Sequence, residues 1–200
     1  MSELRLFDNE YNCVIAGVDE AGRGPLAGPV VAAAVIIEDY FEELEEINDS
    51  KKLTEKKREE LYAVIREKCK VGIGTADEKE IDKINILNAT FLAMRRALEQ
   101  IDNYDIVLVD GNHKIREYSG RQEEIIKGDG RSLSIAAASI VAKVYRDNIM
   151  KDIAQQYPDY RFEKHKGYGT KLHRELLHAH GACKIHRKTF LRKILGEQGE

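Results

Sequence analysis

Residues 14–31 constrain the fold more than any other stretch, because an apolar segment runs directly into two adjacent carboxylates and a glycine-rich loop. Residues 14–18 have the composition of a buried strand, and Asp19 and Glu20 follow without a spacer. Carboxylates beside an apolar run are costly unless a cation meets them, and a divalent metal is a common solution. The sequence therefore predicts a strand that delivers acidic groups to a cation site.

The loop after these acids has the chemistry of a contact with a phosphate or a sugar. Gly22 and Gly24 let backbone amides approach such a group, and Arg23 supplies a positive charge. In an extended strand Asp19 and Glu20 point to opposite faces, so both serve one site only if the strand breaks here. The two glycines permit that break, and we expect one.

Apolar periodicity and capping residues predict the other elements. Strands are expected at 13–18, 29–37, 70–75, 105–111 and 123–127; helices at 54–68, 84–101, 132–157, 171–179 and 187–195; a helical turn at 77–80; a basic, aromatic loop at 162–169. The first two strands form a hairpin, 70–75 adds a third antiparallel strand, and 105–111 is central and parallel to a neighbour. Residues 38–49 carry seven acids and no base, which predicts an exposed connection. No element is predicted before residue 13.

A second apolar strand also ends in an aspartate, Asp110. Ligand sites form where strands of an α/β sheet end, so Asp19 and Asp110 lie side by side if their strands are neighbours. Two carboxylates at that range repel and share protons unless a cation lies between them. With Glu20 and with Asp129, which precedes an alanine-rich helix, four acids suit one or two Mg²⁺ or Mn²⁺ ions.

Simpler interpretations of these residues stay open on the pattern alone. A lone aspartate at a strand end is more often a turn or cap residue than a metal ligand. Asp129 fits a helix start, Tyr168 fits a residue that packs a loop, and Lys143 with Asp147 fits an ordinary ion pair at i,i+4.

Composition limits the class of protein. Two hundred residues suffice for one main domain with a full core, and no apolar run approaches the roughly 20 residues that span a bilayer. Residues 1–12 lack the regions of a signal peptide, so we expect a cytoplasmic protein without a membrane partner. We also expect a monomer. Cys13, Cys69 and Cys183 are odd in number and far apart, which favours free thiols.

Charge is unevenly distributed along the chain. The net charge is −3, yet residues 160–200 hold ten Lys and Arg against four Glu. This basic segment can supply an electrostatic footprint for a phosphate backbone, although a solvated helical surface explains it equally well. His178, His180, Cys183 and His186 are zinc-like residue types, but the first two would not share a helix face. Zinc is therefore disfavoured.

A series of short motifs resembles one known family, ribonuclease HII, the type 2 branch of the ribonuclease H family. The motifs occur in the order that this family uses and span nearly the whole chain: residues 19–24 (DEAGRG), 49–53 (DSKKL), 109–111 (VDG), 127–129 (KGD), 134–144 (SIAAASIVAKV), 146–147 (RD) and 165–168 (HKGY). The related type HIII enzymes carry a sizeable N-terminal extension, and only 12 residues precede the first strand here, so HII is the better match.

The resemblance implies a ribonuclease H-like α/β fold, with a five-stranded mixed sheet flanked by helices and a helical C-terminal segment. We expect a catalytic domain at 1–157 and a basic segment at 158–200 that packs on it as one structural unit. The implied activity is hydrolysis of the RNA strand of RNA/DNA hybrids, and of duplex DNA at embedded ribonucleotides. Two Mg²⁺ or Mn²⁺ ions would promote in-line attack, leaving a 5′-phosphate and a 3′-hydroxyl.

Carried over residue by residue, Asp19, Glu20, Asp110 and Asp129 match the four acidic catalytic and metal-binding positions. Gly22, Arg23 and Gly24 match the loop that recognises the ribonucleotide, and Tyr168 matches a tyrosine that packs on the substrate sugar. Lys51, Lys52 and Lys143 are candidates for phosphate contacts. The alternatives are a nucleic-acid binding module without cleavage and a different metal-dependent phosphotransferase. No sequence feature supports a replication clamp as a partner.

Overall fold

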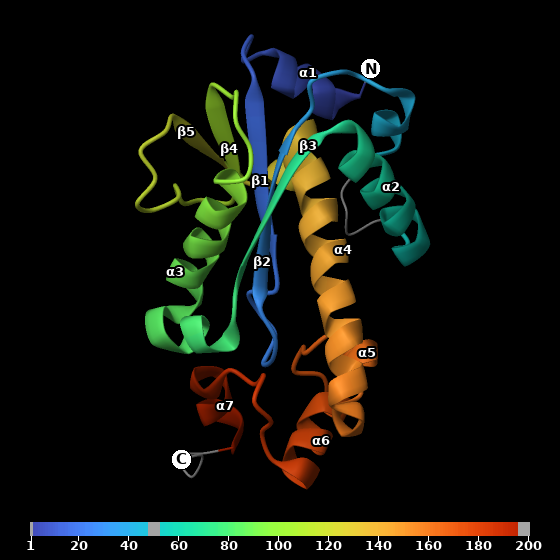
Figure 1. Ribbon diagram of the computed structural model, residues 1–200, viewed down its shortest axis with the longest axis vertical. Helices are drawn as coiled ribbons and strands as arrows, with labels where there is room; N and C mark the ends of the chain where they lie inside the picture. Colours follow the sequence, from blue (N-terminus) through green and yellow to red (C-terminus); the bar gives the residue numbers. More distant parts are fainter. Residues whose placement is uncertain (1, 48–52, 196–200) are drawn as a thin grey trace.

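The computed structural model describes residues 2–47 and 53–195, and Lys51 and Lys52 lie outside that range. A five-stranded sheet with strand order β3-β2-β1-β4-β5 forms its centre (Figure 1). The strands are β1 (Ile15–Ala21), β2 (Val30–Ile36), β3 (Lys70–Ala76), β4 (Ile106–Asp110) and β5 (Gln122–Ile125). The three strands β1, β2 and β3 pair antiparallel, whereas β4 pairs parallel with both β1 and β5, so the predicted hairpin and central parallel strand are confirmed.

Helices cover both faces of the sheet. They are α1 (Glu3–Asn9), α2 (Glu55–Lys68), α3 (Glu78–Leu98), α4 (Leu133–Gln156), α5 (Phe162–His165), α6 (Lys171–His180) and α7 (Lys188–Leu195), with 3₁₀ turns η1 (Glu42–Glu46), η2 (Gly128–Gly130) and η3 (Pro158–Tyr160). Side-chain caps begin helices α2, α3 and α6: Thr54 and Thr170 accept hydrogen bonds from first-turn amides, and Asp77 and Glu80 form a capping box.

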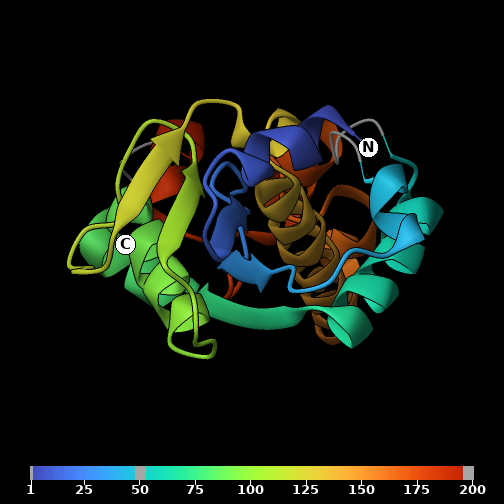
Figure 2. The ribbon, with the colours of Figure 1, turned by 90° about the horizontal axis from the view of Figure 1, so that it is seen from above.

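Two apolar layers hold the sheet between α3 and α4 (Figures 1 and 2). On one face, Phe91 and Met94 of α3 pack against Val18 and other β-strand side chains. On the other face, the alanine-rich turns of α4 pack with Leu61 and Ile65 of α2. Small side chains on α4 let its backbone lie close to the sheet.

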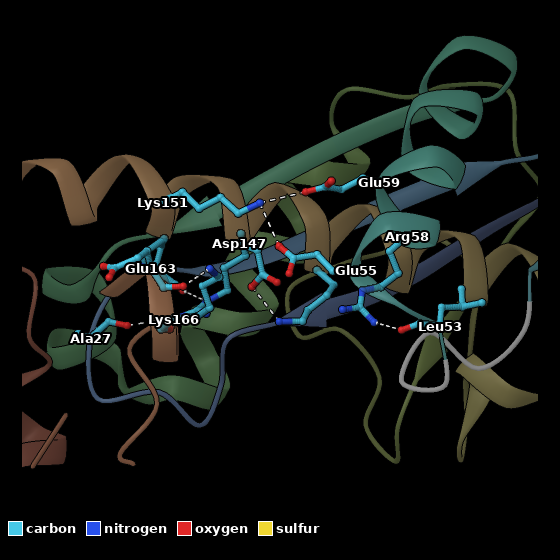
Figure 3. Close-up of polar contacts among 12 residues, drawn as sticks. Ala27, Leu53, Glu55, Arg58, Glu59, Asp147, Lys151, Glu163 and Lys166 are labelled. Atoms are coloured by element: carbon cyan, nitrogen blue, oxygen red, sulfur yellow. Dashed lines mark hydrogen bonds and ion pairs between the residues drawn. The ribbon is translucent and has the colours of Figure 1, made fainter. Parts of the chain in front are cut away.

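Lys151 of α4 forms ion pairs with two glutamates of α2 (Figure 3). Its Nζ lies 3.0 Å from Glu55 Oε1 and 3.0 Å from Glu59 Oε1, one turn apart on α2. All three side chains are partly exposed, so the bridge adds little energy and mainly fixes how the two helices are aligned.

Helix α4 approaches the sheet closely at Gly17 of β1. A Cβ there would lie 2.2 Å from the Ser134 carbonyl carbon and 2.4 Å from the Ile135 nitrogen of α4. Backbone atoms cannot move aside as a flexible side chain can, so only glycine fits. This contact places the end of β1 against the N-terminal half of α4.

We expect Gly17→Ala to lower the free energy of unfolding by about 3 kcal/mol or more, because the added methyl group overpacks a contact between two backbones. Chemical denaturation measures the effect. Gly130→Ala is the matched control, since a Cβ there meets nothing within 4 Å, and it should change stability by less than about 0.5 kcal/mol. Equal stability of the two variants would contradict the packing described here.

Several predicted boundaries were wrong. Helix α1 occupies part of the N-terminus for which no element was predicted, and α3 starts at Glu78 and bends at Asn85, where φ is 66°. The acidic connection is not wholly exposed, because Leu44 and Ile47 are buried in the α2 and α4 layer. Strand β5 begins and ends earlier than predicted, and α5 replaces the first half of the predicted loop at 162–169.

The C-terminal helices pack at the end of the sheet opposite α1 (Figure 1). Phe162, Leu177 and Leu191 form a third apolar cluster with Leu26 and Met150. The backbones of Ala27 and His186 also pair as an isolated antiparallel β-bridge. This cluster attaches the C-terminal segment to the glycine-rich loop. All three cysteines are free and partly buried. Among the described residues, none of the helices has the length and apolar character needed to cross a membrane.

Candidate active site

The carboxyl ends of β1 and β4 bring Asp19 and Asp110 together. The strands run parallel with Val18 paired to Val109, so the next residue of each strand is an aspartate. Asp19 is only 5% exposed. The negative charges of Glu20 and Asp110 both act on it and disfavour its ionised form.

Asp19 faces α4, on the same side of the sheet as Gly17, and bonds to Ser139. Its Oδ1 also accepts the backbone N–H of Glu20 at 2.7 Å. Burial raises the pKa of the Asp19 carboxyl well above its ordinary value, and the charges of Glu20 and Asp110 raise it further. Ser139 was not among the predicted site residues, since nothing in the alanine-rich run distinguishes it.

Glu20 faces the α3 side of the sheet, where it lines a small hollow with Phe91, Met94 and Asp110. Burial raises the pKa of Glu20, and the Arg23 guanidinium, 3.2 Å from Oε1, opposes that shift. The predicted strand break between the two acids was wrong, because β1 continues to Ala21 in regular register with β2. Asp19 and Glu20 point to opposite faces of the sheet, and the negative charge of Asp110, at the end of β4, acts on both of them.

Backbone amides from η2 hold Asp110 in place. Its Oδ1 accepts the N–H of Gly128 at 2.6 Å and the N–H of Asp129 at 3.3 Å. A Cβ at Gly128 would lie 3.2 Å from that same oxygen, which favours glycine there. Asp129, which donates the second of these bonds, is itself buried, with 6% of its surface exposed.

This donor set suits a hard divalent cation. Carboxylate oxygens are the ligands that Mg²⁺ and Mn²⁺ prefer, and positive charge would relieve the repulsion that raises the pKa of Asp19 and Glu20. Within residues 2–47 and 53–195, no three His, Cys, Asp or Glu side chains surround one point as closely as ligands surround an ion. The fit to a metal therefore rests on donor chemistry and on the unfavourable burial of these charges.

Of the predicted substrate residues within the described chain, Gly22, Arg23 and Gly24 follow directly after β1. Gly22 has φ +99°, a left-handed conformation that other residues adopt only with strain. The Tyr168 side chain is 43% exposed, and a Cβ at Gly24 would lie 3.8 Å from its ring. The glycine-rich loop and Tyr168 therefore form adjoining walls. Lys143 lies in an ion pair with Asp147 at 2.8 Å, the simpler interpretation of that pair.

A chain of neutral histidines lies behind Tyr168. His173 Nδ1 lies 3.0 Å from the Tyr168 carbonyl oxygen, so it carries the proton and leaves Nε2 as an acceptor. His186 Nε2, 3.0 Å from that acceptor, must therefore donate, and its Nδ1 accepts the Cys183 N–H at 3.0 Å. Burial lowers the pKa of His173 and of His186 to about 4. The sequence did not single out His173, because one of its partners is a backbone carbonyl and the other lies 13 positions along the chain.

We expect this chain to make stability fall as the pH drops from about 6.5 toward 4. In that window the unfolded chain takes up protons that buried His173 and His186 do not, so the free energy of unfolding decreases. Melting temperatures measured across the window should fall less steeply in His173→Asn than in the wild type. His178→Asn, at an exposed position, should keep the wild-type slope. Identical slopes in all three proteins would argue against the neutral chain.

A mixed sheet in this strand order, with carboxylates at the ends of β1 and β4 and helices on both faces, defines a ribonuclease H-like fold and a site suited to metal-dependent phosphodiester chemistry. Comparison with known proteins identifies the branch. The family model for Ribonuclease HII matches residues 16–193. The chain belongs to the ribonuclease HII family, and it is a metal-dependent endoribonuclease.

Relatives and solved structures agree with this assignment. Ribonuclease HII of Fusobacterium nucleatum is 64% identical over 98% of this chain and 94% of that protein, and that of Caldicellulosiruptor bescii is 56% identical over 96% and 93%. The ribonuclease H2 structure from Pyrococcus horikoshii has a TM-score of 0.73 at 28% identity, covering 90% of this chain and 96% of that one.

Two further similar structures were solved with a protein partner or a metal ion. The structure of the PCNA:RNase HII complex from Archaeoglobus fulgidus has a TM-score of 0.70 at 26% identity, covering 88% of this chain and 94% of that one. Bst-RNase HIII in complex with Mn²⁺ has a TM-score of 0.67 at 18% identity, covering 84% and 63%, and at that identity it shows the fold alone. The predicted ribonuclease H-like fold is confirmed.

Proposed function

We propose that this endoribonuclease cuts the RNA strand of RNA/DNA hybrids and also cuts duplex DNA at single embedded ribonucleotides, leaving a 5′-phosphate and a 3′-hydroxyl. The observation that carries the proposal is the concentration of acidic groups at one sheet edge, where burial and mutual repulsion raise the pKa of Asp19. A module that only bound nucleic acid would gain nothing from buried negative charge facing a phosphate backbone.

In this proposal Asp19 and Asp110 are the primary metal ligands, and Glu20 and Asp129 complete the coordination or orient water. The bound Mg²⁺ or Mn²⁺ ions, two with substrate present, would activate water and stabilise the leaving oxygen. The amides of Gly128 and Asp129 support this role by fixing one oxygen of Asp110, and Ser139 supports it by orienting Asp19. The manganese complex of the fold neighbour is consistent with such ions.

We assign recognition of the ribonucleotide to the two adjoining walls, the glycine-rich loop and Tyr168. Only the 2′-hydroxyl distinguishes RNA from DNA at one position, so it must be read by groups that approach the sugar closely. Backbone at Gly22, Arg23 and Gly24 permits that approach, and the Tyr168 ring offers a surface for the sugar. Lys51, Lys52 and Lys143 are proposed to contact phosphates.

The wider setting is also proposed from these comparisons and from composition. The Archaeoglobus complex makes a replication clamp the candidate protein partner. We propose that the protein acts in the cytoplasm as a monomer, in repair of DNA that contains ribonucleotides.

The test is a pair of duplexes, one with a single ribonucleotide and its all-DNA twin, assayed with Mg²⁺ or Mn²⁺. We expect a cut only in the first duplex, with the 5′-phosphate on the downstream product. Binding of both without cleavage would favour the binding module. Activity on mononucleotides with indifference to the 2′-hydroxyl would favour a different phosphotransferase.

A further inference from the structure

The two largest fully buried side chains of the described residues are arginines, and neither was predicted to have a role. Arg146 of α4 is 1% exposed, and Arg187, directly before α7, is 0% exposed. Both approach the glycine-rich loop from inside the protein. Every hydrogen bond that their guanidinium groups donate within the described chain goes to a backbone carbonyl.

Arg187 holds both ends of the loop. Its Nη2 donates to the Gly22 carbonyl at 2.6 Å and its Nη1 donates to the Arg23 carbonyl at 3.0 Å. Its Nε and Nη2 both donate to the Gly28 carbonyl, at 2.9 and 2.8 Å. One planar group thus fixes the distance between residues that lie six positions apart.

Arg146 joins the loop to the segment that carries Tyr168. Its Nε donates to the Pro29 carbonyl at 3.0 Å and its Nη2 donates to the Ala27 carbonyl at 3.2 Å, both on the loop. Its Nη1 donates to the Lys166 carbonyl at 3.1 Å, two residues before Tyr168. The Tyr168 ring centre lies 5.8 Å from the guanidinium carbon, so this one side chain touches both walls.

Stability alone does not account for the pair. Both guanidinium groups bond to uncharged carbonyls, and burial, followed by the charge of Arg146, lowers the pKa of Arg187 to about 9. Burying like charges is costly, and buried charges are weak evidence for net stability. A guanidinium does offer several donors in a rigid plane, which a lysine cannot reproduce. Such a set of donors can hold several backbone carbonyls in one fixed arrangement.

Gly22 shows how tightly the parts fit. A Cβ at Gly22 would lie 2.1 Å from Arg146 Nε and 2.8 Å from the Pro29 carbonyl oxygen. The arginine stem therefore occupies the space that any other side chain would need. The left-handed backbone of Gly22 and the position of the Arg146 guanidinium therefore depend on each other.

We propose that Arg146 and Arg187 are positioning residues that set the discrimination between ribose and deoxyribose, by fixing the glycine-rich loop relative to Tyr168. The inference rests on the proposed function, since it concerns how that site reads the 2′-hydroxyl. Because discrimination depends on a close fit to one hydroxyl, loosening the walls should reduce discrimination more than it reduces cleavage of a continuous hybrid.

The test compares Arg146→Lys and Arg187→Lys with the wild type and with Arg66→Lys, an exposed control on α2. Both site variants keep the positive charge and lose the planar set of donors. The first readout is the ratio of dissociation constants for the two matched duplexes, measured with Ca²⁺ in place of Mg²⁺. The second is kcat and KM on a continuous RNA/DNA hybrid. Melting temperatures establish folding.

We expect each site variant to lose about tenfold in the ratio, the size of one hydrogen bond, while kcat on the continuous hybrid stays within about threefold. The Arg66→Lys control should match the wild type in every readout. Folded variants with the wild-type ratio would overturn the proposal. So would failure of both to fold, because the pair would then serve the fold itself. A wild type that treats the two duplexes alike would instead contradict the proposed function.

Discussion

Asp19→Asn is expected to abolish cleavage of an RNA/DNA hybrid, by about 1,000-fold or more, while the hybrid still binds. Asparagine keeps the shape of the side chain and removes the charge that a divalent ion requires. Loss of a metal ligand forfeits several kcal/mol of transition-state stabilisation, and each 1.36 kcal/mol is tenfold in rate. Single-turnover cleavage and a separate binding assay measure the two effects.

The same variant should not be less stable without metal. Because the folded pKa of Asp19 lies above its unfolded value, the ionised carboxyl destabilises the metal-free fold once the pH exceeds that folded pKa. Removing the charge should leave the melting temperature at pH 8 equal to or above that of the wild type. Asp152→Asn, an exposed acid on α4, is the matched control and should change neither rate nor melting temperature. Cleavage by Asp19→Asn within tenfold of the wild type would refute the metal role.

Metal affinity is expected to fall steeply as the pH drops. Burial and neighbouring charges raise the pKa of Asp19 and Glu20. At least one carboxyl of the site therefore stays protonated at a pH where ordinary carboxyls are ionised. Metal binding must displace that proton, which lowers affinity about tenfold per pH unit for each proton displaced. Mn²⁺ titrations between about pH 5 and 8, in metal-free buffer, measure the slope.

Chelation of the ions should stop cleavage at every pH in that range, and added Mn²⁺ should restore it. The Asp152→Asn variant should reproduce the wild-type slope. Mn²⁺ affinity that stays constant from about pH 5 to 8 would contradict the raised pKa values and the coupling of ligands to protons.

The sheet and most helices were predictable because their signals are local. Capping residues such as Thr54 and Asp77 and the apolar stripe of α3 act within a few positions. Helix α1 and the buried Leu44 of η1 were not predictable in that way, because distant partners stabilise both. Ser134 of α4 donates to Asp8 of α1 at 2.8 Å, and Leu44 is buried among side chains of other elements.

The meeting of acidic residues at the ends of β1 and β4 was predictable from the residue types, but the geometry of the site was not. Two strands that each end in an aspartate predicted the approach of Asp19 to Asp110. The expectation of a strand break failed because it treated the site as lying on one face of the sheet. The sequence did not predict the roles of Arg187 or of Arg146, which it placed only in the motif at 146–147, since their partners are carbonyls up to 165 positions away. Backbone acceptors leave no residue type to recognise.

The most direct test of the account is where a divalent ion binds. Anomalous diffraction from crystals soaked in Mn²⁺ at pH 8 should show density beside the carboxylates of Asp19 and Asp110, and the same soak of Asp110→Asn should lose it. Manganese bound elsewhere, or bound equally in both proteins, would contradict the claim that these two strand ends form the metal site.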